Sequence, residues 1–326
     1  MTSPLVSVLM PCYNAQNYIG EALASVFGQT WPNVEVVIVD DGSTDNSINI
    51  ARKIAGERCT LIEQPNRGAA HARNKALKHA AGSWCLFLDA DDWLDPNFIL
   101  DQLEAITVAD ADICFGNSVL VWPHGRRVEK VSMPADSSID FALSGVLADG
   151  WYPLHALLWR TSFAHQIGGW DTSLRRNQDG EFIARALLQR PRITASAGSR
   201  AIYRQHSGTR ISSRIDHLSV ESNVRIIERL CLAITPVQDM PLARRSLSRQ
   251  AFELASEAYH LGYRDLGFRA EAIWQTLGPP YQRTGSLLHR IGTRLMGLEG
   301  KVVLAKRLHT FKRSASAPLA RRDPRR

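Results

Sequence analysis

Short apolar runs alternate with helical patterns at the start of this chain, and this order limits the folds that it can adopt. Four runs have the length and composition of strands, and three segments between them show helical spacing or helix-start residues. The apolar runs are Val6–Met10, Val34–Val39, Thr60–Glu63 and Trp84–Leu88, and the helical segments are Tyr18–Phe27, one opened by Ser43 and Thr44, and Ala69–His79. Strands that alternate with helices form a mostly parallel sheet covered by helices, so we expect an α/β fold.

The rest of the chain follows two other patterns. Ala111–Tyr203 mixes strands and short helices, including one at Gly180–Leu188, whereas the pattern from Asp216 onward is purely helical. We therefore expect a domain boundary near Ser213. The expected parts are an α/β domain at 1–213, a helical region at 214–310 and a basic tail at 311–326.

The net charge of +7 comes mostly from the end of the chain. The last sixteen residues carry six basic side chains and one acid. This distribution argues against a nucleic acid groove across the folded domain and favours a disordered, surface-seeking tail.

Cysteine usage and hydropathy bear on the compartment. The five cysteines are widely spaced and show no metal-ligand spacing, so we expect buried thiols in a reducing cytosol. The first residues enter a strand without the basic start of a signal peptide, and no apolar run approaches the roughly 20 residues of a spanning helix. The expected location is cytoplasmic, with contact to the inner face of the membrane left open.

Polar residues follow three of the predicted strands, at Pro11–Asn14, Asp40–Ser43 and Asp89–Asp92. Because ligands bind beyond the carboxyl ends of parallel strands, we expect these residues to meet at one edge. Asp89 and Asp91 stand two apart on an extended segment, so their carboxylates share a face and suit Mg²⁺ or Mn²⁺. The alternative is a solvated loop in which Asp92 or Asp95 caps the helix that begins near Pro96.

Two of these segments also have a purely structural interpretation. Val39–Ser47 suits either a turn that leads into a helix or a carboxylate that accepts hydrogen bonds from a base or ribose. Tyr13 suits either a stack on a base or a position in the core.

Five segments together resemble family 2 inverting glycosyltransferases of the GT-A fold, in order and approximate spacing. They are VSVLMPCYNAQNYIGEALASVFGQTWPNVEVVIVDDGSTDNS, NRGAAHARNKALKHAAGSWCLFLDADDWLDP, IGGWDTSL, NQDGEF and YRQHSGTRIS. The resemblance covers Leu5–Ser213, about two thirds of the chain. It implies that a sugar passes from a nucleoside-diphosphate sugar to an acceptor hydroxyl, with inversion and without a covalent intermediate.

The resemblance implies a nucleotide site formed by the first two segments. Pro11 and Tyr13 resemble the residues that frame the base, and Asp41 resembles the one that hydrogen-bonds it. Gly68 and Arg73 resemble the loop and helix that line the site, although Arg73 also suits a helix surface. The nucleotide that the family favours is UDP, with GDP and dTDP as alternatives.

The resemblance also implies a metal site. Asp89 matches the acid that faces the ribose, and Asp91 matches the acid that holds the Mn²⁺ or Mg²⁺ bridging the diphosphate. Arg204 and His206 stand where the family often has a diphosphate or metal contact. The alternative is that His206 is an ordinary polar residue after a strand.

Asp179, in NQDGEF, matches the family's catalytic base, which removes the proton of the acceptor hydroxyl. The family often has a glutamate before this residue, where this chain has Gln178. Asp179 also suits a helix cap, and the two roles are compatible because a helix N-terminus favours negative charge. Trp170 and Asp171 resemble the acceptor-side segment, or else form a turn followed by a packed Trp.

The acceptor is less defined than the donor. The Gln-x-x-Arg-Trp motif of processive synthases is absent after Asp179, which favours one sugar per encounter with a saccharide or a lipid-linked acceptor. Leu287–Leu308 sets apolar residues three or four apart with basic residues between them. This pattern suits a helix on anionic lipid, or a solvated helix that packs on the core.

Two other functions remain open on the sequence. A catalytically degenerate transferase domain could act as a scaffold for the helical region, although the presence of both Asp91 and Asp179 argues against it. A haloacid-dehalogenase-type phosphatase also places Asp-x-Asp after an apolar strand, but Trp93 stands where that family has a small residue.

Overall fold

The structure of the chain, a computed structural model, describes residues 3–130, 138–149, 152–205, 215–278, 297–300 and 302. The chain divides into two compact units. Unit 1 comprises Met1–Arg214 with Asp239–Ala243, and unit 2 comprises Ile215–Gln238 with Arg244–Arg326. His206, the tail and most of Leu287–Leu308 lie outside the described residues, so the predictions for them stay predictions.

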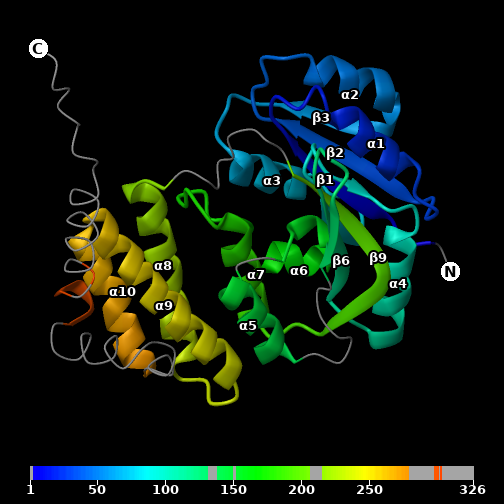
Figure 1. Cartoon of the computed structure of the whole chain (residues 1–326). Coiled ribbons are helices and arrows are strands. Elements are labelled where there is room, and N and C mark those ends of the chain that lie inside the picture. Colours follow the sequence, from blue (N-terminus) through cyan, green and yellow to red (C-terminus); the bar gives the residue numbers. More distant parts are fainter. Residues whose placement is uncertain are drawn as a thin grey trace, which may run out of the picture. The chain divides into compact units, whose positions relative to one another are not determined.

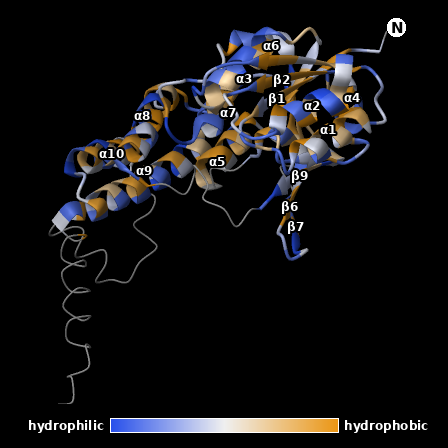
Figure 2. Cartoon of the chain, turned by 90° about the horizontal axis from the view of Figure 1, so that it is seen from above, coloured by the Kyte–Doolittle hydropathy of each residue, from blue (hydrophilic) through white to orange (hydrophobic). Residues whose placement is uncertain are grey.

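Unit 1 contains a nine-stranded sheet with the order β3-β2-β1-β4-β8-β6-β9-β5, in which β7 pairs with β6. The parallel strands of the first half are β1 (Val6–Cys12), β2 (Val34–Asp40), β3 (Cys59–Glu63) and β4 (Trp84–Phe87). Every residue of β1 is buried, because helices cover both faces of a parallel sheet. In Figure 2 the apolar strands β1 and β2 lie between the helices that cover the two faces of the sheet. The predicted alternation of strands and helices is confirmed.

The second half of the sheet is mixed. The strand β8 (Leu157–Arg160) runs antiparallel to β4 and to β6 (Ile113–Val121), and β9 (Ile193–Arg204) runs parallel to β6. The short β5 (Trp93–Leu94) pairs antiparallel with β9, and β7 (Arg127–Lys130) forms a hairpin with β6. Asp89–Asp92 therefore lies where the parallel half meets the mixed half.

Helices cover the sheet in a way that follows from the strand order. The helices α1 and α2 lie on one face of the parallel strands and α3 lies on the other (Figure 1), because right-handed crossovers change face when the strand order reverses after β3. The bounds are α1 Ile19–Phe27, α2 Ser47–Ala55, α3 Ala69–Lys78, α4 Phe98–Ala109, α5 Ile139–Asp149, α6 Thr161–Gln166 and α7 Gln178–Leu188, with short 3-10 helices η1 Gly56–Arg58 and η2 Leu154–Ala156.

The loops after β1 and β2 hold each other through side chains. The Ser43 Oγ accepts from the Asn14 backbone N–H at 2.9 Å, and Asn14 Oδ1 accepts from the Thr44 N–H at 2.8 Å. Asp45 likewise accepts from the Gln16 N–H at 3.1 Å. Ser43 and Thr44 therefore connect two loops and do not cap a helix, so α2 begins later than the sequence predicted.

Unit 2 is helical, as the sequence predicted. Its helices are α8 (His217–Ile234), α9 (Pro241–Leu261, whose first three residues belong to unit 1) and α10 (Arg264–Leu277). A capping box of Asp216 and Ser219 opens α8. Arg269 on α10 makes two 2.8 Å hydrogen bonds with Glu228 on α8. Within the described ranges, no helix has the length and apolarity needed to cross a membrane.

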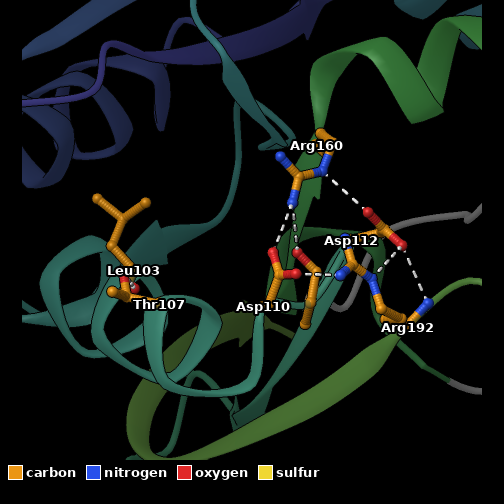
Figure 3. Close-up of polar contacts among 7 residues, drawn as sticks. Leu103, Thr107, Asp110, Asp112, Arg160 and Arg192 are labelled. Carbon is orange, nitrogen blue, oxygen red and sulfur yellow. Dashed lines mark hydrogen bonds and ion pairs between the residues drawn. The ribbon is translucent and has the colours of Figure 1, made fainter.

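Charged residues tie three strands together at the edge of the sheet opposite the carboxyl ends of β1 to β4 (Figure 3). Asp112 accepts from Arg160 Nε at 2.9 Å and from the Arg192 backbone N–H at 3.0 Å. Arg192 also pairs with Asp110. Burial alone would raise the pKa of Asp112, but these hydrogen bonds outweigh it and hold the pKa below its usual value.

The Asp112 network predicts a pH-dependent contribution to stability. A depressed carboxyl pKa stabilises the fold above the unfolded pKa of about 3.9, and this contribution is lost as the pH falls through the folded pKa. Asp112→Asn should therefore lower the free energy of unfolding by about 1–2 kcal/mol at pH 7. The difference from wild type should shrink as urea titrations move toward pH 3. Glu104→Gln, exposed on α4, is the control, and a difference for Asp112→Asn that is constant with pH would contradict the assignment.

Candidate active site

Three acidic side chains follow β4 and lie close together at the carboxyl edge of the parallel strands. Asp89, Asp91 and Asp92 each offer a carboxylate oxygen, and these atoms lie within 4.8 Å of one another. Hard oxygen ligands of this kind suit a divalent cation such as Mg²⁺ or Mn²⁺. Like charges at this spacing repel unless positive charge lies among them.

Arg73 on α3 supplies one positive charge to this cluster. The residue is only 5% exposed, so it does not lie on the helix surface. Its guanidinium contacts Asp89 Oδ1 at 2.7 Å and Asp179 Oδ1 at 3.1 Å. Burial opposes the charge, but the carboxylates of Asp179, Asp89 and Asp91 outweigh it and raise the pKa of Arg73 above its usual value. Arg73 therefore brings Asp179 and the loop Asp89–Asp92, called the acidic loop below, into one site.

Asp179 is the second residue of α7 and remains partly open to solvent, with 38% of its side chain exposed. The indole Nε1 of Trp170 donates to Asp179 Oδ1 at 3.0 Å. This is the same oxygen that Arg73 contacts. Two donors from different elements thus fix one oxygen of the carboxylate.

Trp170 is buried, and its ring serves as a packed support. The ring stacks on Phe182 with 4.0 Å between centroids and meets the edge of Phe87 at 4.5 Å. Asn74 on α3 accepts from the Trp170 backbone N–H at 2.7 Å and donates to its carbonyl at 3.0 Å. Trp170, which the sequence predicted to belong to an acceptor-side segment, is therefore a buried residue whose indole contacts Asp179. The acceptor-side role stays a prediction.

The glycine before Trp170 lets the backbone of this segment approach the Asn74 side chain closely. Gly169 has a φ of +75°, and a Cβ there would lie 2.3 Å from Asn74 Oδ1. From the other side, Arg185 on α7 donates to the Gly169 carbonyl at 2.6 Å and is held by Glu181 at 2.8 Å. The segment is thus clamped between α3 and α7.

Asp92 is buried and does not cap a helix. Its Oδ2 lies 3.1 Å from His155 Nδ1, and its Oδ1 accepts from the Arg204 backbone N–H at 2.8 Å. Both Asp92 and His155 are at most 2% exposed, and the Tyr203 ring stacks on His155 at 5.6 Å. Burial raises the pKa of Asp92 to about 6, although His155 opposes the shift. Asp92 therefore anchors the acidic loop to the second half of the sheet.

Arg204, at the end of β9, contacts the acidic loop directly. Its Nε donates to the Asp91 carbonyl at 3.0 Å, and its guanidinium pairs with Glu21. The same group lies over the rings of Trp93 at 4.3 Å and Tyr18 at 5.1 Å. The side chain predicted to contact a diphosphate therefore borders the acidic loop.

The predicted nucleotide residues lie at the ends of the first strands. Asp41 is buried and accepts from Gln64 Nε2 at 2.8 Å, from the Arg67 N–H at 2.9 Å and from the Gly68 N–H at 2.7 Å. A carboxylate has about four acceptor positions, so one remains for a further donor. Pro11 is buried within β1, whereas Tyr13 is 52% exposed just beyond it.

Asp171 is placed at the predicted acceptor side by a local turn. Its Oδ1 accepts from the Ser173 N–H at 2.9 Å and from the Ser173 hydroxyl at 2.6 Å. This turn follows the clamped Trp170 and precedes α7, so in the sequence Asp171 lies between Trp170 and Asp179.

A family model matches much of the sequence that forms this site. Residues 7–170, half of the chain, match the model of the family described as Glycosyl transferase family 2. The chain belongs to glycosyl transferase family 2. The chain is 38% identical to glycosyltransferase GlyA of Streptococcus pneumoniae over 114 residues, which are 34% of this chain and 16% of that protein. The chain spans less than two thirds of the length of the curated relatives that it matches first.

Solved structures share the fold of this family 2 glycosyltransferase. S. aureus TarS, in complex with UDP-GlcNAc, superposes with a TM-score of 0.72 at 20% identity, over 94% of this chain and 92% of that chain. Mannosyltransferase PcManGT of Pyrobaculum calidifontis, in complex with GDP-Man and Mn²⁺, gives 0.51 at 20% identity, over 95% and 88%. The likeness confirms the predicted GT-A fold of the glycosyltransferase.

Several positioning residues were not found from the sequence. Asn74 directly follows Arg73 in a segment that carried the family resemblance, so its place in the motif was a usable signal. His155 lies in the 3-10 helix before β8, and no motif surrounds it. Glu181 and Arg185 have the i, i+4 spacing of an ordinary helix pair, which does not reveal that Arg185 also holds a loop.

The clamped glycine gives a prediction with a matched control. Gly168 also has a positive φ, +88°, but no atom lies within 4 Å of a Cβ built there. Gly168→Ala should cost about 1–2 kcal/mol of unfolding free energy through the left-handed backbone alone. Gly169→Ala should cost about 1–3 kcal/mol more, because its Cβ also overlaps Asn74. Urea unfolding of both variants measures the difference, and equal losses would contradict the clamp.

The buried pair predicts a second stability effect. His155→Leu leaves the Asp92 carboxylate buried without its side-chain partner, and loss of one member of a buried pair typically costs about 3–5 kcal/mol. His165→Leu, exposed on α6, is the control and should change stability little. Urea unfolding at pH 7 that gives the same small loss for both variants would show that His155 does not support Asp92.

Proposed function

We propose that this chain is a metal-dependent inverting glycosyltransferase that moves one sugar from a nucleoside-diphosphate sugar to an acceptor hydroxyl, in polysaccharide or glycolipid synthesis. The observation that carries the proposal is the Arg73 bridge, which joins Asp89 of the acidic loop to Asp179. The group that holds the donor phosphates and the base that activates the acceptor must both lie near one anomeric carbon. The Arg73 bridge holds Asp89 and Asp179 close enough for this.

The donor would lie across the ends of β1, β2 and β4. Tyr13 offers an exposed ring for a base, Asp41 keeps one acceptor position for a base N–H, and Pro11 and Gly68 shape the surrounding loops. UDP is the nucleotide that we propose, supported by the TarS complex with UDP-GlcNAc. GDP is the alternative, since the mannosyltransferase of the same fold holds GDP-Man.

The acidic loop fits a divalent cation. We assign Asp91 to the metal, because it belongs to this acidic cluster and matches the second acid of the Asp-x-Asp pair in the family resemblance. Mg²⁺ and Mn²⁺ usually keep several waters and bind through one or two carboxylates together with substrate phosphates. When bound, the cation supplies positive charge to the departing diphosphate. His206 remains the second ligand that we propose, and Arg204 the cationic side chain nearest the diphosphate.

Asp179 is the base that we propose. Trp170 and Arg73 both contact Oδ1, so Oδ2 is the oxygen that we assign to proton removal. The acceptor oxygen gives its proton to Asp179 Oδ2 and attacks the anomeric carbon, while the bond from that carbon to the diphosphate breaks. One displacement of this kind inverts the configuration and needs no protein nucleophile.

The acceptor would approach over Asp171 and the turn that contains it. We propose a saccharide or a lipid-linked saccharide as the acceptor, and a cytoplasmic location. Contact with the inner face of the membrane through Leu287–Leu308 also remains a proposal, because that segment lies mostly outside the described residues.

Two variants separate donor binding from transfer. We expect that Asp91→Ala loses the Mn²⁺-dependent rise in melting temperature produced by nucleotide sugars, because only ligands that bind the native state stabilise it. Asp179→Asn should keep that rise but lose transfer by about 10²- to 10⁴-fold, the usual contribution of a general base. A thermal-shift screen of UDP, GDP and dTDP sugars identifies the donor, and an assay of released nucleotide measures transfer.

The control for both variants is Asp95→Ala, which changes an acid just beyond β5 that we do not assign to the metal. Donor affinity in Asp91→Ala equal to wild type would refute the metal assignment. Transfer by Asp179→Asn at the wild-type rate would refute the base. A wild-type protein that binds a nucleotide sugar and never cleaves it would favour the degenerate scaffold.

A further inference from the structure

The β6–β7 hairpin extends from the sheet of unit 1 with a hydrophilic tip (Figure 2). Its turn runs from Trp122 to Arg126, where the Trp122 N–H donates to the Arg126 carbonyl at 3.0 Å. The Arg126 guanidinium lies over the Trp122 ring at 4.9 Å. The turn is therefore held in shape by its own residues, although β7 pairs with no described strand except β6.

The hairpin carries an excess of exposed positive charge. Arg126, Arg127 and Lys130 are all exposed, and none of them makes an ion pair with a carboxylate of the described residues. The single acid of β7, Glu129, is already paired with Arg200 on β9 at 2.9 Å. Nothing described on the hairpin neutralises its three outer cations.

The strand register places Arg127 beside the candidate active site. Val121 on β6 pairs with Arg204 on β9 and with Arg127 on β7. Directly paired residues point to the same face of a sheet, so Arg127 and Arg204 share a face. Two strand spacings put their Cα atoms about 10 Å apart. Because Arg204 donates to the Asp91 carbonyl, the hairpin borders the acidic loop.

The hairpin lies on the side of β4 that the nucleotide residues do not use. Pro11, Tyr13 and Asp41 lie at the ends of β1 and β2, on one side of β4 in the strand order, and β6 and β7 lie on the other side. An acceptor longer than one sugar must cross a surface next to the site without displacing the nucleotide. The hairpin is such a surface.

We propose that the β6–β7 hairpin binds an acceptor saccharide chain that carries negatively charged groups, such as carboxylates or phosphates. The proposal rests on the proposed function, because it needs an acceptor at this site. Exposed cations attract such a chain over distances near the Debye length, so binding weakens as salt rises. The charged groups of the chain replace the partners that Arg126, Arg127 and Lys130 lack among the described residues.

The test measures binding of a short fluorescein-labelled oligogalacturonate by anisotropy, with a neutral maltooligosaccharide of equal length for comparison. The double variant Arg127→Glu and Lys130→Glu should weaken oligogalacturonate binding by about tenfold at low salt. The control, Lys53→Glu with Lys78→Glu, changes the net charge equally at exposed positions on α2 and α3, and it should change binding less than twofold.

A third variant should move the affinity the other way. Glu129→Gln removes the only acid of β7 and releases Arg200 from its pair, so it should tighten oligogalacturonate binding by about two- to threefold. Equal weakening in the hairpin and control variants would reduce the effect to net charge and overturn the proposal. Equal affinity of the wild type for the charged and the neutral chain would overturn it as well.

Two further arms separate the neighbouring hypotheses. Phosphatidylglycerol vesicles test a membrane surface: loss of vesicle binding in the hairpin variant, with oligogalacturonate binding unchanged, would overturn the proposal in favour of lipid. Stabilisation by UDP with Mn²⁺ should be the same in wild type and all variants. A wild type that shows no stabilisation by any nucleotide would count against the proposed function, whereas the result with oligogalacturonate would still decide what the hairpin binds.

Discussion

A buried guanidinium between two carboxylates is the interaction on which this site depends. Arg73 cannot lose its charge in a protein, so its burial requires acids on both sides. Asp89 and Asp179 meet this need from opposite parts of the chain. The same contacts reduce the repulsion among four nearby carboxylates before any metal binds. The arrangement of the site therefore follows from the cost of burying one charge.

The contacts around this bridge hold one oxygen of Asp179, and the other is the oxygen that we propose for proton removal. The Trp170 indole and Arg73 both reach Oδ1, and the aromatic stack with Phe182 prevents the indole from tilting away. Asn74 holds the backbone of Trp170 from α3, while Arg185 holds the preceding carbonyls from α7. A carboxylate that is already held in position needs little reorganisation during proton transfer. This lowers the activation barrier of a step in which the carboxylate acts as a base.

The sequence predicted the fold and the strand ends because these depend on local pattern. Apolar runs such as Val34–Val39 report a buried strand wherever they occur, and the polar residues after them must lie at its end. Arg73 shows the limit of this reasoning, because its burial depends on Asp179, which is far away in sequence. His155 shows it more strongly. Neither its spacing nor its neighbours reveal that it meets Asp92, since that contact exists only after β8 pairs with β4.

The two halves of the sheet carry different parts of the candidate site, and side chains of α3 contact both parts. The parallel half presents loops that close on Asp41 and suit a nucleotide, whereas the mixed half presents α7 and the charged hairpin. Arg73 and Asn74 are adjacent on α3, and adjacent helical residues point about 100° apart. One therefore reaches Asp89 and Asp179 while the other reaches Trp170. A single helix thus links Asp89 of the acidic loop, Asp179 and the Trp170 segment. The proposed acceptor surface on the hairpin lies outside these contacts, so the proposal allows acceptor preference to change there without disturbing them.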